Sequence, residues 1–557
     1  MSYYSGNKRR VSPLGSALFH MGILSMVAVE AFAAQGALKG IKPADRESTA
    51  HPLARWPEVV MTAASFRVEG RESLLLAQAD RTIENDPSGE NLPDAEPEAI
   101  DLEGSSHDSV SDAVADSDED GGRENIHRLK GFVQSDNFIS ISPDQEFSGA
   151  FKKNEIRNSL DYRLGTSPLH LQVKSGLSLL AHVFSDEINS RYVYSDRFRV
   201  DRNLRITSPS VELNFNELYV NYEIGIVRMR LGNQLYSWGT TDAFNPTAYF
   251  NPYDLREFLF KDQDDIRIGV PSVSALITIG ECSLELVLVP VHVPMILPEP
   301  GNFWGITYRE GPFPVTVARP GAMDVGADGI GAGVQLYMNY FRTDMYLTLY
   351  RGPDREPVLR PWGTIIAPNA LVSLLVVPEY HPFTAMGVAV SRPVDKFIVQ
   401  AEFSYSPDRT GVVEQPYTKD LTLPFELRRS HYISYSIGCN YLVPLGDLFA
   451  WHDGDAVLTV EWMQSRYTDG ELMKPLFTDI LVAQFRDSFF DSRLKASLTA
   501  IIDIADGSYS ILPAAEYKFK NGVSLMLSCV FIESREGSIL GYYNDNDGVI
   551  LRVRYEY

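Results

Sequence analysis

The chain has 557 residues, of which 22% are charged, and a formal net charge of -23. This acidic balance argues against nucleic acid as a partner, because nucleic acids select basic surfaces. Residues 80–124 carry much of the charge, with sixteen Asp and Glu against Arg81 and Arg123, and they contain no aromatic residue. Such a segment cannot bury enough apolar surface to offset the entropy lost on ordering, so it is predicted to be disordered.

The N-terminus has the layout of a secretory signal peptide. Lys8, Arg9 and Arg10 form a basic region, residues 14–29 are mostly apolar, and Ala31-Phe32-Ala33 offers a small-residue cleavage site. We therefore expect residues 1–33 to be removed, with an uncleaved anchor as the alternative. Beyond this segment there is no uncharged apolar run of about 18 residues, so no further membrane helix is predicted.

Residues 34–127 are predicted to be an acidic extension in the periplasm, a mobile arm rather than a plug. One part of it, Asp116 to Gly121, copies the opening of an EF-hand calcium loop. The twelfth position of that loop is His127, where calcium needs a bidentate Glu, and no apolar helices flank it. We interpret the segment as a solvated linker, and the sequence predicts no metal or other cofactor anywhere in the chain.

From residue 128 to residue 557 the sequence is a series of segments in which apolar and polar residues alternate. In 396–405, for example, Phe397, Val399, Ala401, Phe403 and Tyr405 oppose Gln400, Glu402 and Ser404. Alternating segments of about ten residues are typical of a membrane barrel with a wet interior. A soluble sandwich alternates too, but its strands are usually shorter. We count about eighteen strands, with 16 as an alternative: 129–141, 154–163, 169–184, 209–223, 226–236, 270–279, 281–291, 329–341, 343–351, 384–392, 396–407, 430–443, 455–466, 478–488, 493–504, 508–519, 522–533 and 546–557.

The connections between these strands differ in length from one end to the other. With the C-terminus in the periplasm, that side receives mostly short turns, while the opposite side receives 186–208, 237–269, 292–328, 352–383 and 408–429. Short periplasmic turns facing long outer loops are typical of bacterial outer-membrane barrels. The fold class predicted is therefore all-β, a transmembrane antiparallel β-barrel in the cell outer membrane.

A motif follows the fifth predicted strand. It contains Gly232, Gln234, Trp238 and Gly239, then Asp242 with Asn245-Pro246, then Asn251-Pro252 with Asp254. Each proline fixes its own φ and holds the preceding residue extended, so two Asn-Pro pairs define a compact loop. This motif resembles that of a family of uncharacterised porin-like outer-membrane proteins marked by G-x-Q-x-x-x-W-G, D-x-x-N-P and N-P-x-D. The resemblance implies the barrel fold and gives no substrate.

In wide barrels the third outer loop often folds inward and narrows the pore. We therefore interpret this loop as a candidate constriction, with Arg228 and Arg230 on the lumen side of the strand beneath it and paired with its acidic residues. The alternative for the loop is a surface loop whose charges are solvated, and the alternative for the two arginines is pairing only with strand neighbours such as Glu212 or Glu223. The candidate pore-lining residues are Arg228, Arg230, Gln234, Trp238, Asp242, Asn245, Asn251, Asp254, Arg256 and Glu257.

The three cysteines, Cys282, Cys439 and Cys529, each share the apolar face of a predicted strand. We interpret them as small apolar side chains that face lipid, with a disulfide as the less favoured interpretation.

The last nine residues alternate as well, with Val549, Leu551, Val553, Tyr555 and Tyr557 on one face. They resemble the closing strand of a bacterial outer-membrane barrel, which implies lipid and, through Tyr557, the barrel assembly machinery as partners.

No catalytic motif supports an enzyme: the sequence lacks G-x-S-x-G, H-E-x-x-H and a P-loop, and its ten histidines show no metal-ligand spacing. The sequence thus predicts a non-enzymatic, porin-like outer-membrane channel for passive or weakly selective passage of small solutes. One alternative is a surface-exposed binding or adhesin barrel that uses 292–328 and 352–383. An outer-membrane hydrolase with a triad assembled from distant residues is a third.

Overall fold

The computed structural model describes the chain from residue 125 onward. The described residues are 125–141, 150–166, 168–181, 192–257, 261, 263–299, 302–305, 315–367, 370–415, 423–448, 452, 454–475, 478–534 and 543–557. The predicted signal peptide, the acidic extension up to residue 124 and most of the segment resembling a calcium loop lie outside these residues.

Eighteen antiparallel strands form one closed barrel. Each strand pairs with the next in the ring, and the last pairs with the first, from Ser140 opposite Gly548 to Phe132 opposite Glu556. The count of eighteen predicted from the sequence is confirmed, and all eighteen predicted segments coincide with barrel strands. The strands are β1 (Asn125–Ser140), β2 (Phe151–Thr166), β3 (Leu169–Leu180), β6 (Val211–Ile224), β7 (Val227–Gln234), β8 (Val270–Ile279), β9 (Cys282–Val289), β11 (Gly331–Tyr340), β12 (Thr343–Pro353), β15 (Pro382–Val394), β16 (Phe397–Val412), β17 (Leu427–Val443), β18 (Ala456–Tyr467), β19 (Asp479–Phe489), β20 (Leu494–Asp503), β21 (Tyr509–Lys518), β22 (Val523–Glu533) and β23 (Gly548–Glu556).

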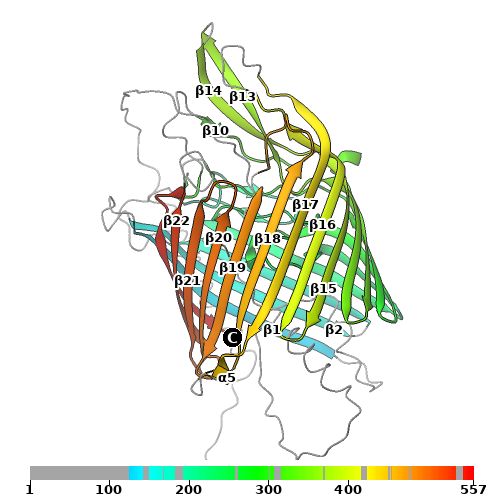
Figure 1. Cartoon of the computed structure of the whole chain (residues 1–557), viewed down its shortest axis with the longest axis vertical. Helices are drawn as coiled ribbons and strands as arrows, with labels where there is room; N and C mark the ends of the chain where they lie inside the picture. Colours follow the sequence, from blue (N-terminus) through cyan, green and yellow to red (C-terminus); the bar gives the residue numbers. More distant parts are fainter. Residues whose placement is uncertain are drawn as a thin grey trace, which may run out of the picture. The chain divides into compact units, whose positions relative to one another are not determined.

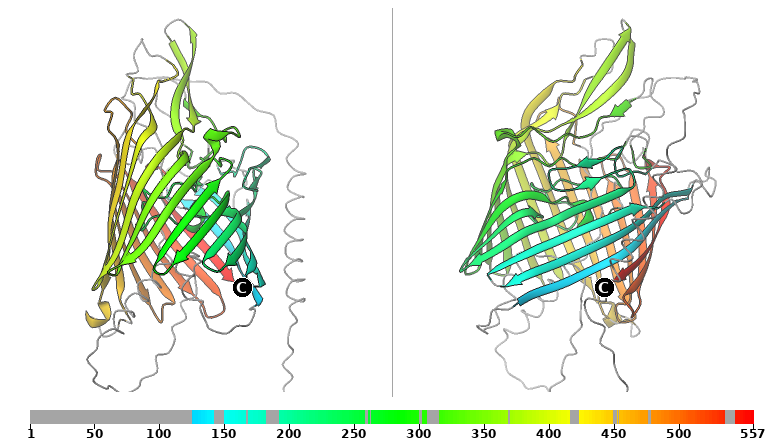
Figure 2. Two further views of the ribbon diagram at one scale, coloured as in Figure 1. Left: turned by 90° about the vertical axis from the view of Figure 1, so that its right-hand side faces the viewer. Right: turned by 180° about the vertical axis from the view of Figure 1, so that it is seen from behind.

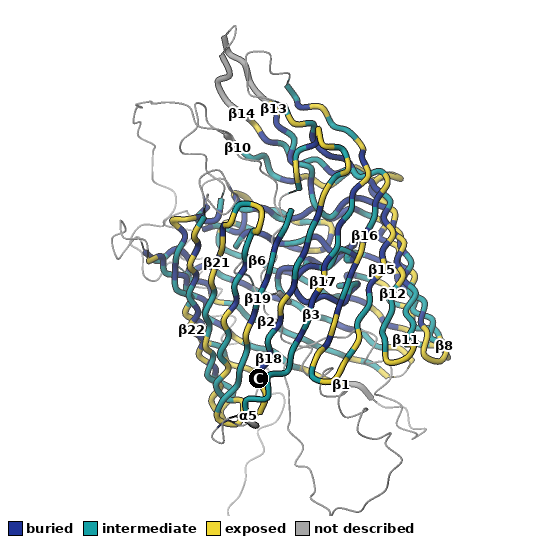
Figure 3. Tube along the Cα trace, viewed as in Figure 1, coloured by how far each residue is buried: buried dark blue, intermediate teal, exposed yellow. Residues whose placement is uncertain are grey.

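The alternation of the sequence becomes the two faces of the barrel wall. Along β16, Phe397, Val399 and Phe403 are exposed on the outside, whereas Gln400 and Glu402 are buried inside. Figure 3 shows the same alternation of buried and exposed residues along the other strands. Because a closed barrel pairs all of its strands and presents apolar side chains outward, the wall is that of a transmembrane β-barrel with a polar lumen.

The two ends of the barrel differ, as the loop lengths predict. One end carries the C-terminus and tight turns such as Gly225-Ile226, between β6 and β7, and Gly280-Glu281, between β8 and β9. Gly225 and Gly280 have φ values of 57° and 60°, which glycine adopts without strain. The opposite end carries the long loops (Figures 1 and 2).

The long loops contain strands that the alternation does not predict. β4 (Arg199–Val200) and β5 (Ile206–Thr207) extend the sheet beside β6, and a separate sheet is formed by β10 (Val315–Val317), β14 (Ala370–Glu379) and β13 (Val358–Ala367). In the part of the chain that the structure describes, the helices are short: α4 (Gln263–Ile266), η2 (Ala327–Gly329) and α5 (Leu445–Leu448). Among the described residues, no helix has the length and apolar character to cross a membrane.

Candidate functional site: a loop that crosses the lumen

The third outer loop follows β7, and two residues before β7 ends there is a position that only glycine fits. Gly232 has a φ of 136°, and a Cβ atom built on it would lie 2.1 Å from the carbonyl oxygen of Leu218 on β6. Two residues later, the Gln234 side chain donates to the Ser272 carbonyl on β8 at 3.1 Å and accepts from the Ser274 hydroxyl at 2.8 Å. These contacts fix the point and direction at which the chain leaves the wall.

The first half of the loop is anchored to Glu402, which points into the lumen from β16. The Glu402 carboxylate accepts the backbone N–H of Thr241 at 2.8 Å and the Thr247 hydroxyl at 2.8 Å, and it also accepts the backbone N–H of Thr240. Asn245, the first Asn-Pro asparagine, adds its side-chain amide at 3.2 Å. One buried carboxylate therefore collects donors from both ends of an eight-residue turn, 240–247.

A second carboxylate, Glu461 on β18, binds the tip of the same turn. It accepts the backbone N–H groups of Asp242, Ala243 and Phe244 at 2.9, 2.8 and 2.7 Å, together with the Ser436 hydroxyl at 2.8 Å. Three successive backbone N–H groups therefore converge on the Glu461 carboxylate through charge-assisted hydrogen bonds.

The positions of these anchors show where the loop runs. Going round the barrel from β7, the strands are β8, β9, β11, β12, β15, β16, β17 and β18, so β18 is the eighth neighbour. In a ring of eighteen strands the farthest strand is the ninth. A loop that leaves β7 and binds β18 therefore passes through the lumen to the opposite wall.

Aromatic rings pack the underside of this crossing against the wall between β9 and β15. The Trp238 ring meets Phe250 edge-to-face with centroids 4.8 Å apart, and Tyr249 stacks on Tyr350 of β12 at 5.2 Å. The Trp238 indole N–H donates to Glu285 on β9 at 2.8 Å. This cluster buries the apolar residues of the motif inside a polar barrel and makes the crossing rigid.

Asn251, the asparagine of the second Asn-Pro pair, ties the two ends of the loop together. Its side-chain amide donates to the carbonyls of Gln234 at 3.1 Å and Ile268 at 2.8 Å, and its oxygen accepts the Tyr236 N–H at 2.7 Å. Gln234 ends β7 and Ile268 lies two residues before β8, so the loop closes on itself at the wall.

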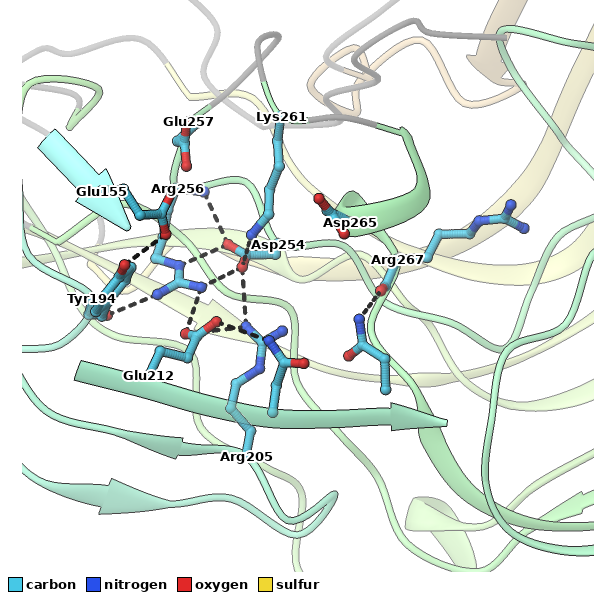
Figure 4. A network of polar contacts seen from close by, with 12 residues as sticks. Glu155, Tyr194, Arg205, Glu212, Asp254, Arg256, Glu257, Lys261, Asp265 and Arg267 are labelled. Atoms are coloured by element: carbon cyan, nitrogen blue, oxygen red, sulfur yellow. Dashed lines mark hydrogen bonds and ion pairs between the residues drawn. The ribbon is translucent and has the colours of Figure 1, made fainter. Parts of the chain in front are cut away.

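The second half of the loop is held by buried charges on the wall from β23 to β6 (Figure 4). Asp254 is completely buried and binds Arg205 at 3.0 Å, Arg256 at 2.8 Å and Lys261. Arg256 also pairs with Glu212 of β6 at 2.7 Å. Burial alone would raise the pKa of Asp254, but Arg256 and Lys261 hold it well below its usual range.

Further ion pairs join the loop to β2. Lys153 binds Glu257 at 2.7 Å, and Arg157 binds Asp265. These pairs belong to a network of six bases and six acids, and all of them except Asp254 line a polar cavity of about 40 Å³. The bases are Lys153, Arg157, Arg205, Arg256, Lys261 and Arg552, and the acids are Asp136, Glu155, Glu212, Asp254, Glu257 and Asp265. The loop is thus held to this wall by charges that balance in number.

The structure brings most of the predicted site residues together, in roles that differ from those predicted. Gln234, Trp238, Asp242, Asn251, Asp254 and Arg256 are buried, and Asn245 and Glu257 are partly buried. Their recorded contacts hold the loop in place. The alternative of a surface loop with solvated charges is therefore wrong, because Asp254 and Arg256 are buried in ion pairs and the buried Asp242 accepts a hydrogen bond from Asn440.

The predicted partners of the two arginines on β7 are corrected. Both side chains lie on the lumen side, opposite the exposed Met229 and Leu231. Arg228, however, lies beside the short turn and pairs with Glu223, its cross-strand neighbour, at 2.7 Å. Arg230 contacts Asn221 at 3.4 Å and lies over the Tyr219 ring. The prediction that the loop's acids bind Arg228 is wrong, and the alternative of pairing with the strand neighbour Glu223 holds for this residue.

Sequence reasoning missed the anchors on the far wall. Glu402 and Glu461 are buried acids on the lumen face of their strands, 3% and 1% exposed. The sequence signal that could have found them is a single carboxylate among uncharged polar residues on one face of a strand, as in Gln400, Glu402 and Ser404.

The cysteine prediction is confirmed: Cys282, Cys439 and Cys529 are free, on the outward side of their strands.

Three solved structures with a partly similar chain path are the following. OccAB1 from Acinetobacter baumannii shares 7% identity, with a TM-score of 0.43 over 77% of this chain and 95% of that one. OccK2 (OpdF) from Pseudomonas aeruginosa, solved in complex with glucuronate, shares 8%, with a TM-score of 0.42 over 77% and 96%. A BenF-like porin from Pseudomonas fluorescens Pf-5 shares 10%, with a TM-score of 0.40 over 78% and 99%.

No curated protein matches this sequence. A family model does match, over residues 169–474, which span β3 to the segment after β18 and contain the whole lumen-crossing loop. That stretch is more than half of the chain. The chain belongs to the family described as "Protein of unknown function (DUF1302)".

Proposed function

We propose that this protein is a channel of the bacterial outer membrane that lets small hydrophilic solutes pass passively, with the third outer loop as its constriction. Three features support the proposal: the closed wall of eighteen strands, its apolar exterior, and a lumen lined by polar side chains. Barrels of 16 to 18 strands are wide enough to leave an aqueous path when they are not fully plugged.

One observation carries the proposal. Glu402 and Glu461 hold residues 240–247 against the wall opposite β7, so a fixed segment of chain narrows the lumen part of the way along. A barrel used only as a surface scaffold needs no such crossing. The two carboxylates also hold residues 240–247 in one position, because they accept seven directed hydrogen bonds from this segment. The segment is therefore not free to swing across the pore and block it.

The charges in the constriction support weak ion selectivity. Within the described network around Asp254, six bases face six acids. Opposed charges that cancel leave no large net field along the pore axis, although they create a field across it. We therefore infer that size, more than net charge, selects the solutes.

The orientation follows the lengths of the connections. The short turns and Tyr557 lie at one end, which we assign to the periplasm, and the long loops lie at the other, which we assign to the cell surface. In this orientation the acidic segment before β1 belongs to the periplasmic side.

A swelling assay tests the function. Purified full-length protein is reconstituted into lipid vesicles, which are then exposed to neutral solutes of increasing size. We expect swelling with the smallest solutes and a cut-off as size grows. Vesicles carrying heat-unfolded protein are the control. Correctly folded barrels that admit none of the solutes would contradict the proposal.

A further inference from the structure

The outer surface of the barrel carries a polar patch in a place where lipid is expected. The patch consists of Ser135 and Asn137 on β1 and Asn154 and Asn158 on β2, and we call it the β1–β2 polar patch. Gln134 and Asp136 are buried in the lumen, so Ser135 and Asn137 between and beyond them face outward. Lys153 and Glu155 fix the orientation of β2 in the same way.

Apolar side chains border this patch along its own strands and on the two neighbouring strands. Along its own strands lie Val133 and Ile156, each 39% exposed. On the neighbouring β23, Leu551 pairs with Asn137 and Val553 pairs with Ser135, and both are exposed on the outside. On β3, the outward Leu177 pairs with Asn158. Ser135, Asn137 and Asn158 therefore have apolar neighbours across their strands, whereas Asn154 lies near the outer end of β2.

The patch satisfies only part of its own hydrogen-bonding capacity. Asn154 donates to the Asn137 side-chain oxygen at 2.8 Å, Asn137 donates to the Ser135 hydroxyl at 3.2 Å, and Asn158 donates to the Tyr557 hydroxyl at 3.2 Å. Each carboxamide has two N–H donors and an oxygen with two acceptor sites. The side-chain oxygens of Asn154 and Asn158 have no hydrogen-bond partner among the described residues. In hydrocarbon such groups cost free energy, since no water replaces the missing bonds.

The wall beneath the patch is closed, so the patch is a stable surface. β1 pairs with β23 along its outer half, and Arg552 binds Asp136 with Nε at 2.6 Å and a second nitrogen at 3.1 Å on the lumen side of this seam. The free amide groups therefore cannot be satisfied by opening the barrel and pairing backbone strands. A partner that satisfies them must approach through the membrane plane.

We propose that the β1–β2 polar patch is the contact surface for a second copy of this chain. Carboxamides are self-complementary, since each one both donates and accepts. Two barrels inserted in the same direction, and related by a two-fold axis along the membrane normal, bring residues of equal depth together. The asparagines of one copy then meet those of the other, and the flanking apolar side chains close the edge of the contact. Interhelical polar contacts in membranes follow the same principle. This inference does not depend on whether the barrel conducts.

The test uses one new cysteine that leaves all four patch residues intact. In a full-length background with Cys282→Ala, Cys439→Ala and Cys529→Ala, Ile156→Cys places a thiol between Asn154 and Asn158. The matched control is Val460→Cys, an outward position of similar exposure on β18, far round the ring. Both proteins are reconstituted at low protein-to-lipid ratio and oxidised, and cross-linked dimers are counted. Heat-modifiable migration verifies that each barrel has folded.

We expect cross-linked dimers for Ile156→Cys and only background for Val460→Cys. Adding Asn154→Leu and Asn158→Leu to Ile156→Cys should lower the dimer yield at least about tenfold, since leucine suits lipid and removes the polar contacts. The proposal is overturned if Ile156→Cys cross-links no better than Val460→Cys. It is also overturned if the dimer yield survives the loss of both asparagines, because the contact would then be apolar or accidental.

Discussion

The carboxylate of Glu461 accepts the backbone N–H of Phe244 at 2.7 Å, although 217 residues separate the two along the chain. Glu461 is fixed in β18 and Phe244 is at the tip of the third outer loop. This hydrogen bond joins the loop, which leaves the barrel wall at β7, to the opposite wall. The stability of the loop depends on its carboxylate anchors and on the balance of charges around Asp254.

The first prediction concerns that balance. Asp254→Asn removes the buried acid that faces Arg205, Arg256 and Lys261, and of these bases only Arg205 and Arg256 also have an ion pair with Glu212. Uncompensated buried charge costs about 3–5 kcal/mol. We expect a lower temperature for heat-modifiable unfolding and a shift of ion selectivity towards anions. Asp491→Asn, in an exposed short turn, is the control and should change neither quantity. An unchanged unfolding temperature in Asp254→Asn would mean that the network does not hold the loop.

The second prediction concerns pH and His292, which is buried in the loop after β9 and accepts the Met323 N–H at 3.0 Å. Burial and the nearby Arg202 lower the pKa of His292 to about 4. Because this pKa lies below the unfolded value of about 6.5, the folded state is fully stable above pH 6.5. It loses up to about 3 kcal/mol as the pH falls from 6.5 to 4.

Thermal unfolding between pH 7 and pH 4.5 checks this second prediction. Asp254, whose pKa is held low by Arg256 and Lys261, loses its contribution only below its usual range, near pH 4 and under. Burial also lowers the pKa of His381, which acts in the same direction, so the share of the drop due to His292 is read from the difference between the wild type and a His292 variant. His292→Asn, which keeps an acceptor for Met323, should flatten the curve. Equal slopes for the two proteins would exclude His292 as the cause.

The third prediction concerns the glycine at the start of the loop. Gly232→Ala puts a Cβ atom 2.1 Å from the Leu218 carbonyl oxygen at a φ of 136°. We expect about 3 kcal/mol or more of destabilisation, seen as loss of the folded barrel in membranes. The control is Gly225→Ala, with a φ of 57° and no atom within 4 Å of the new methyl group. It should cost only about 1 kcal/mol. Similar yields of folded protein for both variants would refute the argument.

The fourth prediction concerns Arg228. Its ion pair with Glu223 is partly exposed and lies beside the short turn, away from the lumen-crossing segment. Arg228→Gln should therefore leave ion selectivity unchanged and lower stability by no more than about 1 kcal/mol. The reversal potential in a salt gradient measures the selectivity. A clear shift towards cations would place Arg228 at the narrowest point, contrary to the structure.

The sequence predicts the barrel well because each wall strand has one face in lipid and one in the lumen, which forces a period of two. Segments such as 358–367 and 370–379 were missed because the first contains Pro361 and the second is a nearly continuous apolar run, without alternation. The loop motif was located correctly, but its binding partners were not. Glu402 and Glu461 lie more than 150 residues from the turn they bind, and a lumen-facing acid has the same sequence pattern whether it lines water or anchors a loop.

Single-channel recording in planar bilayers tests the central claim most directly. The comparison is between the wild-type protein, the double variant Glu402→Gln and Glu461→Gln, and the exposed-turn control Glu281→Gln. An amide replaces one acceptor oxygen with a donor that opposes the loop's N–H groups, at a cost of about 1–3 kcal/mol for each group left unsatisfied. The account predicts small, steady conductance steps for wild type and control, and larger, flickering steps for the double variant. Identical steady traces for all three folded proteins, or no conductance from any of them, would contradict it.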